Sequence, residues 1–340
     1  MKFSSSLNFG DKLVGAGHRC FVIGEAGVAH FGDYGKALQL IDLAAESGAD
    51  AVKFQVFDVG AMISKESGDW KNRMGSRSLS YGEFEKLKDY ANSCDIIFFA
   101  TAHDERSFEF LVQLDVPMYK LGSGEITNWG YIDRVASHEK PVILSTGMSS
   151  ISDIESAVKI FEKHNNPKLA LLHCVTSYPT NPSDVSLKSM RLIAEQYGTV
   201  TGYSDHTIGF HIPLAAVALG ADIIEKHIAL EFNVPDAQDW KVSCGKTNFG
   251  EFISQLRDVE QSLGRYERKP TPSEVMNMQW ALKSLVLARD IKAGMVITED
   301  VLTTKRPGTG ISPNQIDKII GKTVLEDQEK DTVLRWENIR

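Results

Sequence analysis

Short runs of apolar residues alternate with stretches of mixed character through the first three quarters of the chain. Eight runs are nearly continuous, the pattern of parallel strands covered on both faces: 21–26, 51–57, 96–102, 119–124, 142–147, 169–175, 200–206 and 223–228. Apolar residues at helical spacing lie between them, for example at 34–47, 81–93, 152–163 and 212–219. The chain therefore predicts a repeating strand–helix unit.

Eight such repeats predict an α/β fold, a closed (β/α)8 TIM barrel. The alternative is an open, doubly wound sheet, whose first strand–helix turn often carries a Gly-x-Gly-x-x-Gly motif. The glycines around the first predicted strand, Gly24, Gly27 and Gly32, do not have that spacing. We therefore expect the barrel.

The pattern changes after the last barrel helix, which we expect at 249–264. A charged stretch with Pro270 and Pro272 follows it and favours a linker. Beyond the linker lie a β-like run at 284–288, a turn at 292–294 and a glycine-rich basic loop at 305–310. The sequence thus predicts a barrel domain at 1–265, a linker at 266–281 and a small β-rich domain at 282–340.

Composition narrows the classes of function. The 340 residues carry a formal net charge of −8, which argues against a general binder of nucleic acid or of membrane surfaces. The four cysteines show no C-x-x-C spacing, so we expect reduced thiols rather than a disulfide framework. No run of about 18 apolar residues occurs. We expect a cytoplasmic protein.

Polar side chains end the predicted strands, where a TIM barrel has its active site. One group is cationic and carries hydroxyls: Lys53, Lys120, Ser123 and Ser145. Such a group binds phosphate or carboxylate well in the mouth of a barrel. The alternative is that the lysines form structural ion pairs with Glu25 and Glu125.

The second group contains two histidines, His206 and His227, which end consecutive strands near Glu25, Asp205 and Asp239. Two imidazoles on neighbouring strands can bind a divalent metal and leave positions open for water and substrate. A histidine in a barrel can also be an ordinary core residue with satisfied hydrogen bonds. The residues alone predict a metal-assisted barrel enzyme that acts on a phosphorylated or carboxylated metabolite.

At these same segments the chain resembles the sialic acid (nonulosonate) synthase family. The matching segments are Ile-Gly-Glu-Ala-Gly (23–27), Ala-Val-Lys-Phe-Gln (51–55), Lys-Leu-Gly-Ser-Gly-Glu (120–125), Lys-Pro-Val-Ile-Leu-Ser-Thr-Gly-Met (140–148), Leu-His-Cys (172–174), Tyr-Pro-Thr (178–180), Gly-Tyr-Ser-Asp-His-Thr (202–207) and Glu-Lys-His (225–227). The tail, with Lys-Arg-Pro-Gly-Thr-Gly (305–310), resembles the antifreeze-like (SAF) domain that these synthases carry.

The resemblance implies a reaction. Phosphoenolpyruvate condenses with an open-chain N-acylated aminohexose, N-acetylmannosamine or a 2,4-diacetamido-6-deoxy relative, to give a nonulosonic acid and phosphate. It also implies a domain-swapped homodimer, because Arg306 matches an arginine that reaches the site of the partner subunit and contacts the N-acyl group of the sugar.

The resemblance assigns a role to each candidate residue. His206 and His227 would ligate the metal, Mn²⁺ or Mg²⁺, and Glu25 would orient the sugar and move protons. The phosphoenolpyruvate-binding set is Lys53, Thr101, Lys120, Ser123, Ser145 and Ser204. The other substrate-binding positions are Glu125, Thr176, Tyr178 and Asp239.

The chain departs from the family pattern at positions that face the sugar. Thr176 stands where sialic acid synthases have Asn, and 234–241 replaces a Pro-Gly-Pro-Asp stretch. His103 lies in Ala-His-Asp rather than Pro-Phe-Asp, and 60–80 has no clear counterpart to the substrate-contacting residues of the family. The lysines are retained. We therefore expect the same reaction on an altered sugar, such as a 2,4-diacetamido-6-deoxy hexose.

Two other functions remain open from the sequence. One is a 3-deoxy-ulosonate-type condensing enzyme acting on a sugar phosphate, which would need a second phosphate site where only one cationic cluster is evident. The other is a non-catalytic carbohydrate-binding or ice-binding protein, which the tail alone suggests but which leaves the polar strand ends unexplained.

Overall fold

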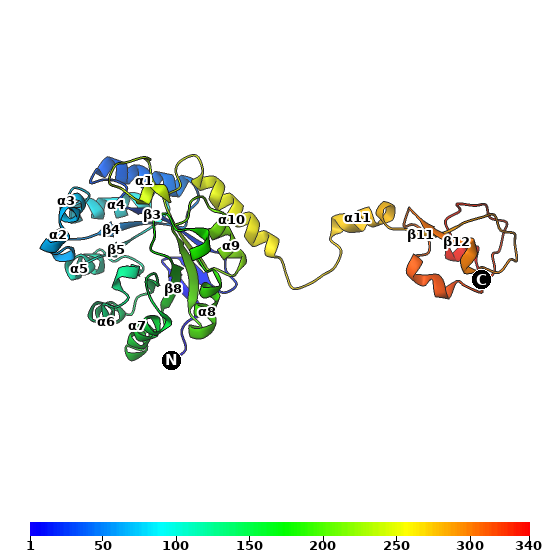
Figure 1. Cartoon of the computed structure of the whole chain (residues 1–340), viewed down its shortest axis with the longest axis horizontal. Helices are drawn as coiled ribbons and strands as arrows, with labels where there is room; N and C mark the ends of the chain where they lie inside the picture. Colours follow the sequence, from blue (N-terminus) through cyan, green and yellow to red (C-terminus); the bar gives the residue numbers. More distant parts are fainter. The chain divides into compact units, whose positions relative to one another are not determined.

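The computed structural model describes residues 1–340, and the chain divides into two compact units, Met1–Gly264 and Arg265–Arg340. The first unit is a closed barrel of eight parallel strands, so the predicted fold is confirmed (Figure 1). The barrel order is β10-β3-β4-β5-β6-β7-β8-β9. The strands are β3 (Phe21–Gly27), β4 (Ala51–Val56), β5 (Ile97–Ala102), β6 (Tyr119–Leu121), β7 (Val142–Ser145), β8 (Leu169–Cys174), β9 (Val200–Asp205) and β10 (Ile223–His227).

Helices surround the barrel on the outside (Figure 1). They are α1 (Tyr34–Glu46), α2 (Val59–Met62), α3 (Asp69–Gly75), α4 (Tyr81–Ser93), α5 (Glu105–Gln113), α6 (Trp129–Ala136), α7 (Ile151–Lys163), α8 (Lys188–Tyr197), α9 (His211–Ala218) and α10 (Phe249–Leu263). The helix predicted at 249–264 is thus present, and so is each of the eight predicted strands. Strand β6 is shorter than predicted, because a 3-10 turn (Ser123–Glu125) replaces its last residues.

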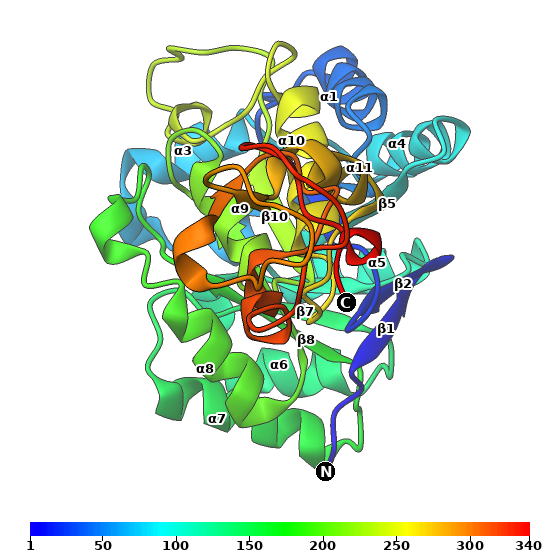
Figure 2. The same ribbon diagram turned by 90° about the vertical axis from the view of Figure 1, so that its right-hand side faces the viewer.

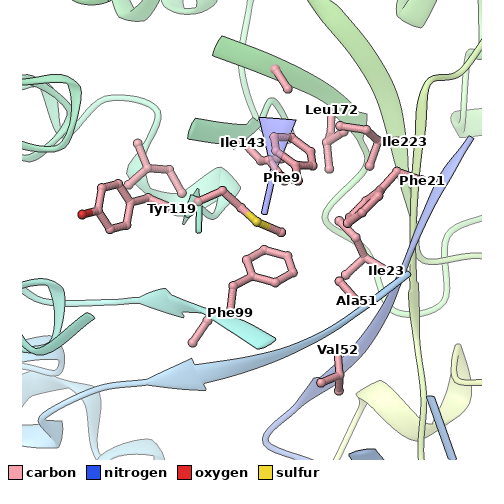
Figure 3. Close-up of a cluster of buried hydrophobic side chains, with 14 of the residues drawn as sticks. Phe9, Phe21, Ile23, Ala51, Val52, Phe99, Tyr119, Ile143, Leu172 and Ile223 are labelled. Atoms are coloured by element: carbon pink, nitrogen blue, oxygen red, sulfur yellow. The ribbon is translucent and has the colours of Figure 1, made fainter. Parts of the chain in front are cut away.

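A hairpin that the sequence did not predict precedes the barrel. It consists of the antiparallel strands β1 (Ser6–Phe9) and β2 (Lys12–Gly15), drawn in dark blue in Figure 2. Its Phe9 is fully buried, with its ring 5.2 Å from that of Phe21 in an edge-to-face arrangement. Figure 3 shows Phe9 among side chains of the barrel strands, including Ile143 and Leu172. Such burial of aromatic area contributes about 2 kcal/mol per side chain, and the hairpin closes the N-terminal end of the core.

The strands change from apolar to polar along the barrel axis. On β10, Ile223 lies in the apolar core (Figure 3). Side chains two apart on a strand face the same side, so Glu225 and His227 follow it on the same face and line the cavity. Strand β3 repeats the pattern with Ile23 followed by Glu25. In these strands, apolar residues therefore form the core inside the barrel, and polar residues form a layer at the C-terminal ends.

In the second unit, a helix occupies the C-terminal part of the segment predicted to be a linker. Helix α11 (Pro272–Ala281) starts with a capping box between Thr271 and Glu274. The linker interpretation rested on Pro270 and Pro272, but proline is well tolerated in the first turn of a helix, where its missing N–H needs no partner. Two antiparallel strands follow, β11 (Ser284–Leu287) and β12 (Leu302–Lys305), with a small apolar core of their own.

None of the helices has the length and the apolar character that crossing a membrane requires.

Candidate active site

The C-terminal ends of the barrel strands enclose a cavity of about 400 Å³. All but two of the residues predicted for the site line it: Glu25, Lys53, Thr101, Lys120, Ser123, Ser145, Thr176, Tyr178, Ser204, His206, His227 and Asp239. A volume of this size is typical of a site for small metabolites. The strand ends thus bring together the residues that the sequence analysis chose.

A buried lysine between two carboxylates forms one wall. Lys53 Nζ lies 2.8 Å from Glu25 Oε2 and 3.6 Å from Glu225 Oε2, and it donates a hydrogen bond to Thr101 Oγ1 at 3.1 Å. Burial raises the pKa of Glu25 to about 7, against the opposing effect of Lys53. Burial would also raise the pKa of Glu225, but Lys53 and Lys120 and the Ser204 hydroxyl lower it to about 2. Two carboxyls in one cavity therefore differ in proton affinity.

The second lysine lies among hydroxyls and backbone amides. Lys120 Nζ donates to Ser145 Oγ at 2.7 Å and to the Leu121 carbonyl at 2.9 Å. Gly147 N donates to Ser123 Oγ at 3.0 Å, and a Cβ at Gly147 would lie only 2.4 Å from Thr176 Oγ1. Only glycine allows this close approach of the backbone. Burial lowers the pKa of Lys120, as expected for a cation that awaits an anionic partner.

The two histidines lie at the ends of the neighbouring strands β9 and β10, with their ring centroids 5.3 Å apart. His206 Nδ1 is 2.7 Å from the Val175 carbonyl, so Nδ1 carries the proton and Nε2 is left for a ligand. Burial lowers the pKa of His206 to about 4 and that of His227 to about 3. Both imidazoles are therefore neutral at pH 7, which is the form that binds a metal.

These two rings fit part of a metal site. Two neutral imidazoles with a nitrogen directed into a cavity are the donors of an open site, in which water and substrate supply the other ligands. The structure contains no group of three or more His, Cys, Asp or Glu side chains arranged to hold an ion. The nitrogen ligands that the protein places side by side are therefore His206 and His227.

The ring of Tyr178 packs on that of His206, with 4.0 Å between the centroids. Asp239, in a 3-10 turn (Asp239–Lys241), lies nearby in the cavity wall, and burial raises its pKa. The pKa of Asp239 also responds to the charges of His206 and Arg77. Asp239 therefore lies within electrostatic reach of His206 and of Arg77 at the outer rim of the cavity.

Two residues lie elsewhere than the sequence analysis placed or used them, and the expected contact of Arg306 with a partner subunit stays a prediction. Glu125 is half-buried outside the cavity lining and accepts a hydrogen bond from Asn128 Nδ2 at 2.8 Å. Asp205, which was expected near the histidines, is fully buried outside the cavity lining and pairs with Lys226. Its strand position explains this, because adjacent residues face opposite sides of a sheet. Arg306 belongs to the second unit, where its guanidinium lies 5.8 Å from the centroid of the Trp280 ring.

Several lining residues received no role from the sequence. Glu225 is two residues from His227 on the same strand, so the period of two could have identified it. His103 follows Thr101 by the same step, and burial with the charges of Lys53 and Lys120 lowers its pKa to about 4. The others lie in the short helix α3, in the turn after it or in a loop, and give no such signal: Trp70, Arg73, Arg77, Asp236 and Gln238.

Comparison with known proteins identifies both parts of the chain. Residues 40–268 match the model of the NeuB family, and residues 283–340 match the model of the SAF domain. The chain is 38% identical to the uncharacterized protein MJ1065 of Methanocaldococcus jannaschii over 98% of each chain. It is 36% identical to the N,N'-diacetyllegionaminic acid synthase of Legionella pneumophila over 97% of each.

A solved structure gives the same result. The N-acetylneuraminic acid (sialic acid) synthetase of Leptospira borgpetersenii matches with a TM-score of 0.76 and 34% sequence identity, covering 82% of this chain and 96% of that one.

Proposed function

The chain belongs to the NeuB family, and from that membership we propose that it condenses phosphoenolpyruvate with an open-chain N-acylated aminohexose to give a nonulosonic acid and phosphate. The observation that carries the proposal is one cavity lined by two buried lysines and by two neutral histidines. The lysines are suited to an anion, and the histidines to a metal that would polarise an aldehyde. The relative from Legionella is named for a diacetylated product, which supports a 2,4-diacetamido acceptor.

Phosphoenolpyruvate binds at the lysine wall. Lys120 is the better phosphate or carboxylate ligand, because its present partners are a hydroxyl and a backbone carbonyl. Lys53 is partly neutralised by Glu25 and Glu225, so it orients the anion and contributes less net charge. The hydroxyls of Ser123, Ser145, Ser204 and Thr101 supply further donors, each worth about 1 kcal/mol.

The aldehyde of the acceptor lies toward the histidine wall. His206 and His227 would hold a divalent ion, Mn²⁺ or Mg²⁺, whose chemistry there is to polarise the aldehyde. Tyr178 packs on His206 and fixes the plane of its ring. Gln55 Nε2 donates to Glu25 Oε1 at 3.2 Å and aims the Glu25 carboxyl at the reacting end of the sugar.

We infer that the active form is a homodimer in which Arg306 of each chain serves the cavity of the other. Support comes from the SAF match at 283–340, which includes Arg306, and from the apolar side chains that α11 exposes, among them Met276 and Trp280. The protein would act as a cytoplasmic biosynthetic enzyme.

Phosphate release from phosphoenolpyruvate tests the proposal. The assay is run with Mn²⁺ against unphosphorylated 2-acetamido and 2,4-diacetamido hexoses and their phosphates. Release that requires one free sugar and stops with chelator supports the synthase. Release with a 3-deoxy-ulosonate precursor, a phosphorylated aldose without an acylamino group, would replace it with the alternative condensing enzyme. No release with any acceptor would refute both.

A further inference from the structure

The outer rim of the cavity is formed by helix α3 and the turn that follows it. Trp70, Arg73 and Met74 line the cavity from one face of the helix, since they are three and four residues apart. Arg77 lines it from the turn just after the helix. Together these four residues form one face, which presents two guanidinium groups and an indole to the cavity.

This face is fixed in place from two directions. Below it, Met74 is buried in a small apolar cluster with Val28, Phe57 and Ile63, separate from the main core. Across the cavity, Arg77 Nη2 donates to the Asp236 carbonyl at 2.9 Å. The loop that carries Asp236 also supplies Gln238 and Asp239 to the cavity, so α3 is connected to the acceptor end of the site.

The arginines retain unused hydrogen-bond donors. A guanidinium has five N–H groups, and Arg77 uses one of them on a backbone carbonyl while its plane lies 5.3 Å from the Phe31 ring centroid. Arg73 Nε is buried and makes no hydrogen bond, since the Asp69 carboxylate is 3.7 Å away. The Arg73 side chain as a whole is 41% exposed, so its terminal N–H groups can donate to a ligand with acceptor atoms.

The charge at this rim is balanced. Arg73 Nη1 lies 4.0 Å from Asp236 Oδ1, and Asp239 lies within electrostatic reach of Arg77. Two cations thus face two carboxylates, and no surplus positive charge is left for a phosphate. Amide carbonyls are acceptors that add no charge, and the half-exposed indole of Trp70 offers apolar surface for an acyl methyl group.

We propose that Trp70, Arg73 and Arg77 select the acceptor by binding the acylamino groups of an unphosphorylated sugar, an inference that rests on the proposed function. The guanidinium groups donate to the amide carbonyl oxygens, and Trp70 covers an acyl methyl. These are specificity residues, because they contact the acceptor away from its reacting aldehyde.

The test compares R73Q, R77Q and W70A with the wild type in the phosphate-release assay. Each arginine variant should raise the acceptor KM about 10-fold or more, as expected for a lost charged hydrogen bond, and leave the phosphoenolpyruvate KM within about 2-fold. The wild type should favour the acceptor with more acylamino groups, and the variants should lose that preference. K71Q is the matched control, because Lys71 is a cation of α3 outside the cavity lining.

The outcomes separate the two proposals. If the wild type does not release phosphate with any of the acceptors tested, the proposed function fails, and this inference fails with it. If the wild type is active but the arginine variants change both KM values equally, or neither, only the acceptor-selecting role is wrong. A wild-type preference for a phosphorylated acceptor that R77Q abolishes would also overturn it, by showing that Arg77 binds an anion.

Discussion

Lys226 and Asp205 form an ion pair of 2.6 Å between the two strands that lead into the cavity histidines. The residues stand directly opposite each other in the register of β9 and β10, and neither is exposed to solvent. Asp205 Oδ1 also accepts hydrogen bonds from Tyr203 Oη and from Thr207 N and Oγ1. Since His206 and His227 are the next residues along each strand, this pair holds the two imidazoles at a fixed separation.

Breaking this pair should destabilise the protein strongly. Lys226→Met leaves the Asp205 carboxylate buried without its cation, for which we expect a loss of about 3–5 kcal/mol in the free energy of unfolding. Urea unfolding followed by circular dichroism measures it. Replacing both residues, Lys226→Met with Asp205→Asn, should recover part of the loss because no unpaired buried charge remains.

The matched control for Lys226→Met is Lys159→Met in the exposed i,i+4 pair of Lys159 with Glu155 on α7. Exposed pairs contribute little because water screens them, so the unfolding midpoint should not move measurably. Equal effects in the two variants would contradict the special role of the buried pair.

Removing either cavity histidine should abolish most turnover with little loss of folded protein. His206→Ala or His227→Ala takes away one of the two proposed nitrogen ligands, and we expect activity to fall on the order of 100-fold or more. Titration with Mn²⁺ by calorimetry should show weaker binding in parallel. His164→Ala, at the surface-exposed end of α7, is the control. Near-normal activity of the variants in the presence of chelator would remove the metal role.

Lys120→Ala should raise the phosphoenolpyruvate KM. A hydrogen bond from a charged donor is worth about 1.5–3 kcal/mol, which corresponds to about 10- to 150-fold. Lys140→Ala serves as the comparison, because Lys140 lies just before β7, at the opposite end of that strand from Ser145. Steady-state kinetics at saturating acceptor gives the phosphoenolpyruvate KM of both variants. An unchanged KM in Lys120→Ala would argue against a contact between Lys120 and the anion.

Acid should destabilise the fold through His30. This fully buried histidine accepts a hydrogen bond from Gly32 N at its Nδ1, and burial lowers its pKa to about 4 from 6.5. Between these values the unfolded chain binds a proton that the folded protein does not, so stability falls as the pH decreases from 6.5 toward 4.

At pH 4.5 this effect amounts to about 2.5 kcal/mol. Other buried histidines add to the total, so the informative quantity is the difference between His30→Phe and the wild type. Urea midpoints at pH 7 and pH 4.5 should lie closer together in the variant. An identical pH dependence in both proteins would show that His30 is protonated in the folded state.

The barrel and most of its cavity could be predicted because both follow from short-range pattern. Nearly continuous apolar runs such as 51–57 identify buried parallel strands, and the closure of a barrel brings the ends of those strands together. Lys53, Lys120 and His227 therefore had to share one cavity as soon as the fold was assigned. Glu225 followed from the same logic but was not given a role.

The features that were not predicted depend on contacts between distant segments. Arg73 belongs to a helix of seven residues in a long loop, and Arg77 to the turn after it; only packing of that segment on Phe57 and Ile63 turns it toward the cavity. The hairpin β1–β2 has strands of four residues, which are too short to show a clear alternation of apolar and polar residues. Phe9 is buried because it packs on Phe21 of the barrel, a contact that the local sequence does not reveal.

Mixing two inactive variants should restore activity if Arg306 serves the partner subunit. His206→Ala disables the barrel site and leaves the tail intact, whereas Arg306→Ala leaves the barrel intact. In a swapped heterodimer one of the two sites combines an intact barrel with an intact tail, and the other combines both defects. Partial unfolding and refolding of an equal mixture, followed by the phosphate-release assay, should therefore recover about a quarter of wild-type activity if subunits exchange at random. Without swapping each barrel uses its own tail, every site in the heterodimer carries one defect, and the mixture stays as inactive as its components.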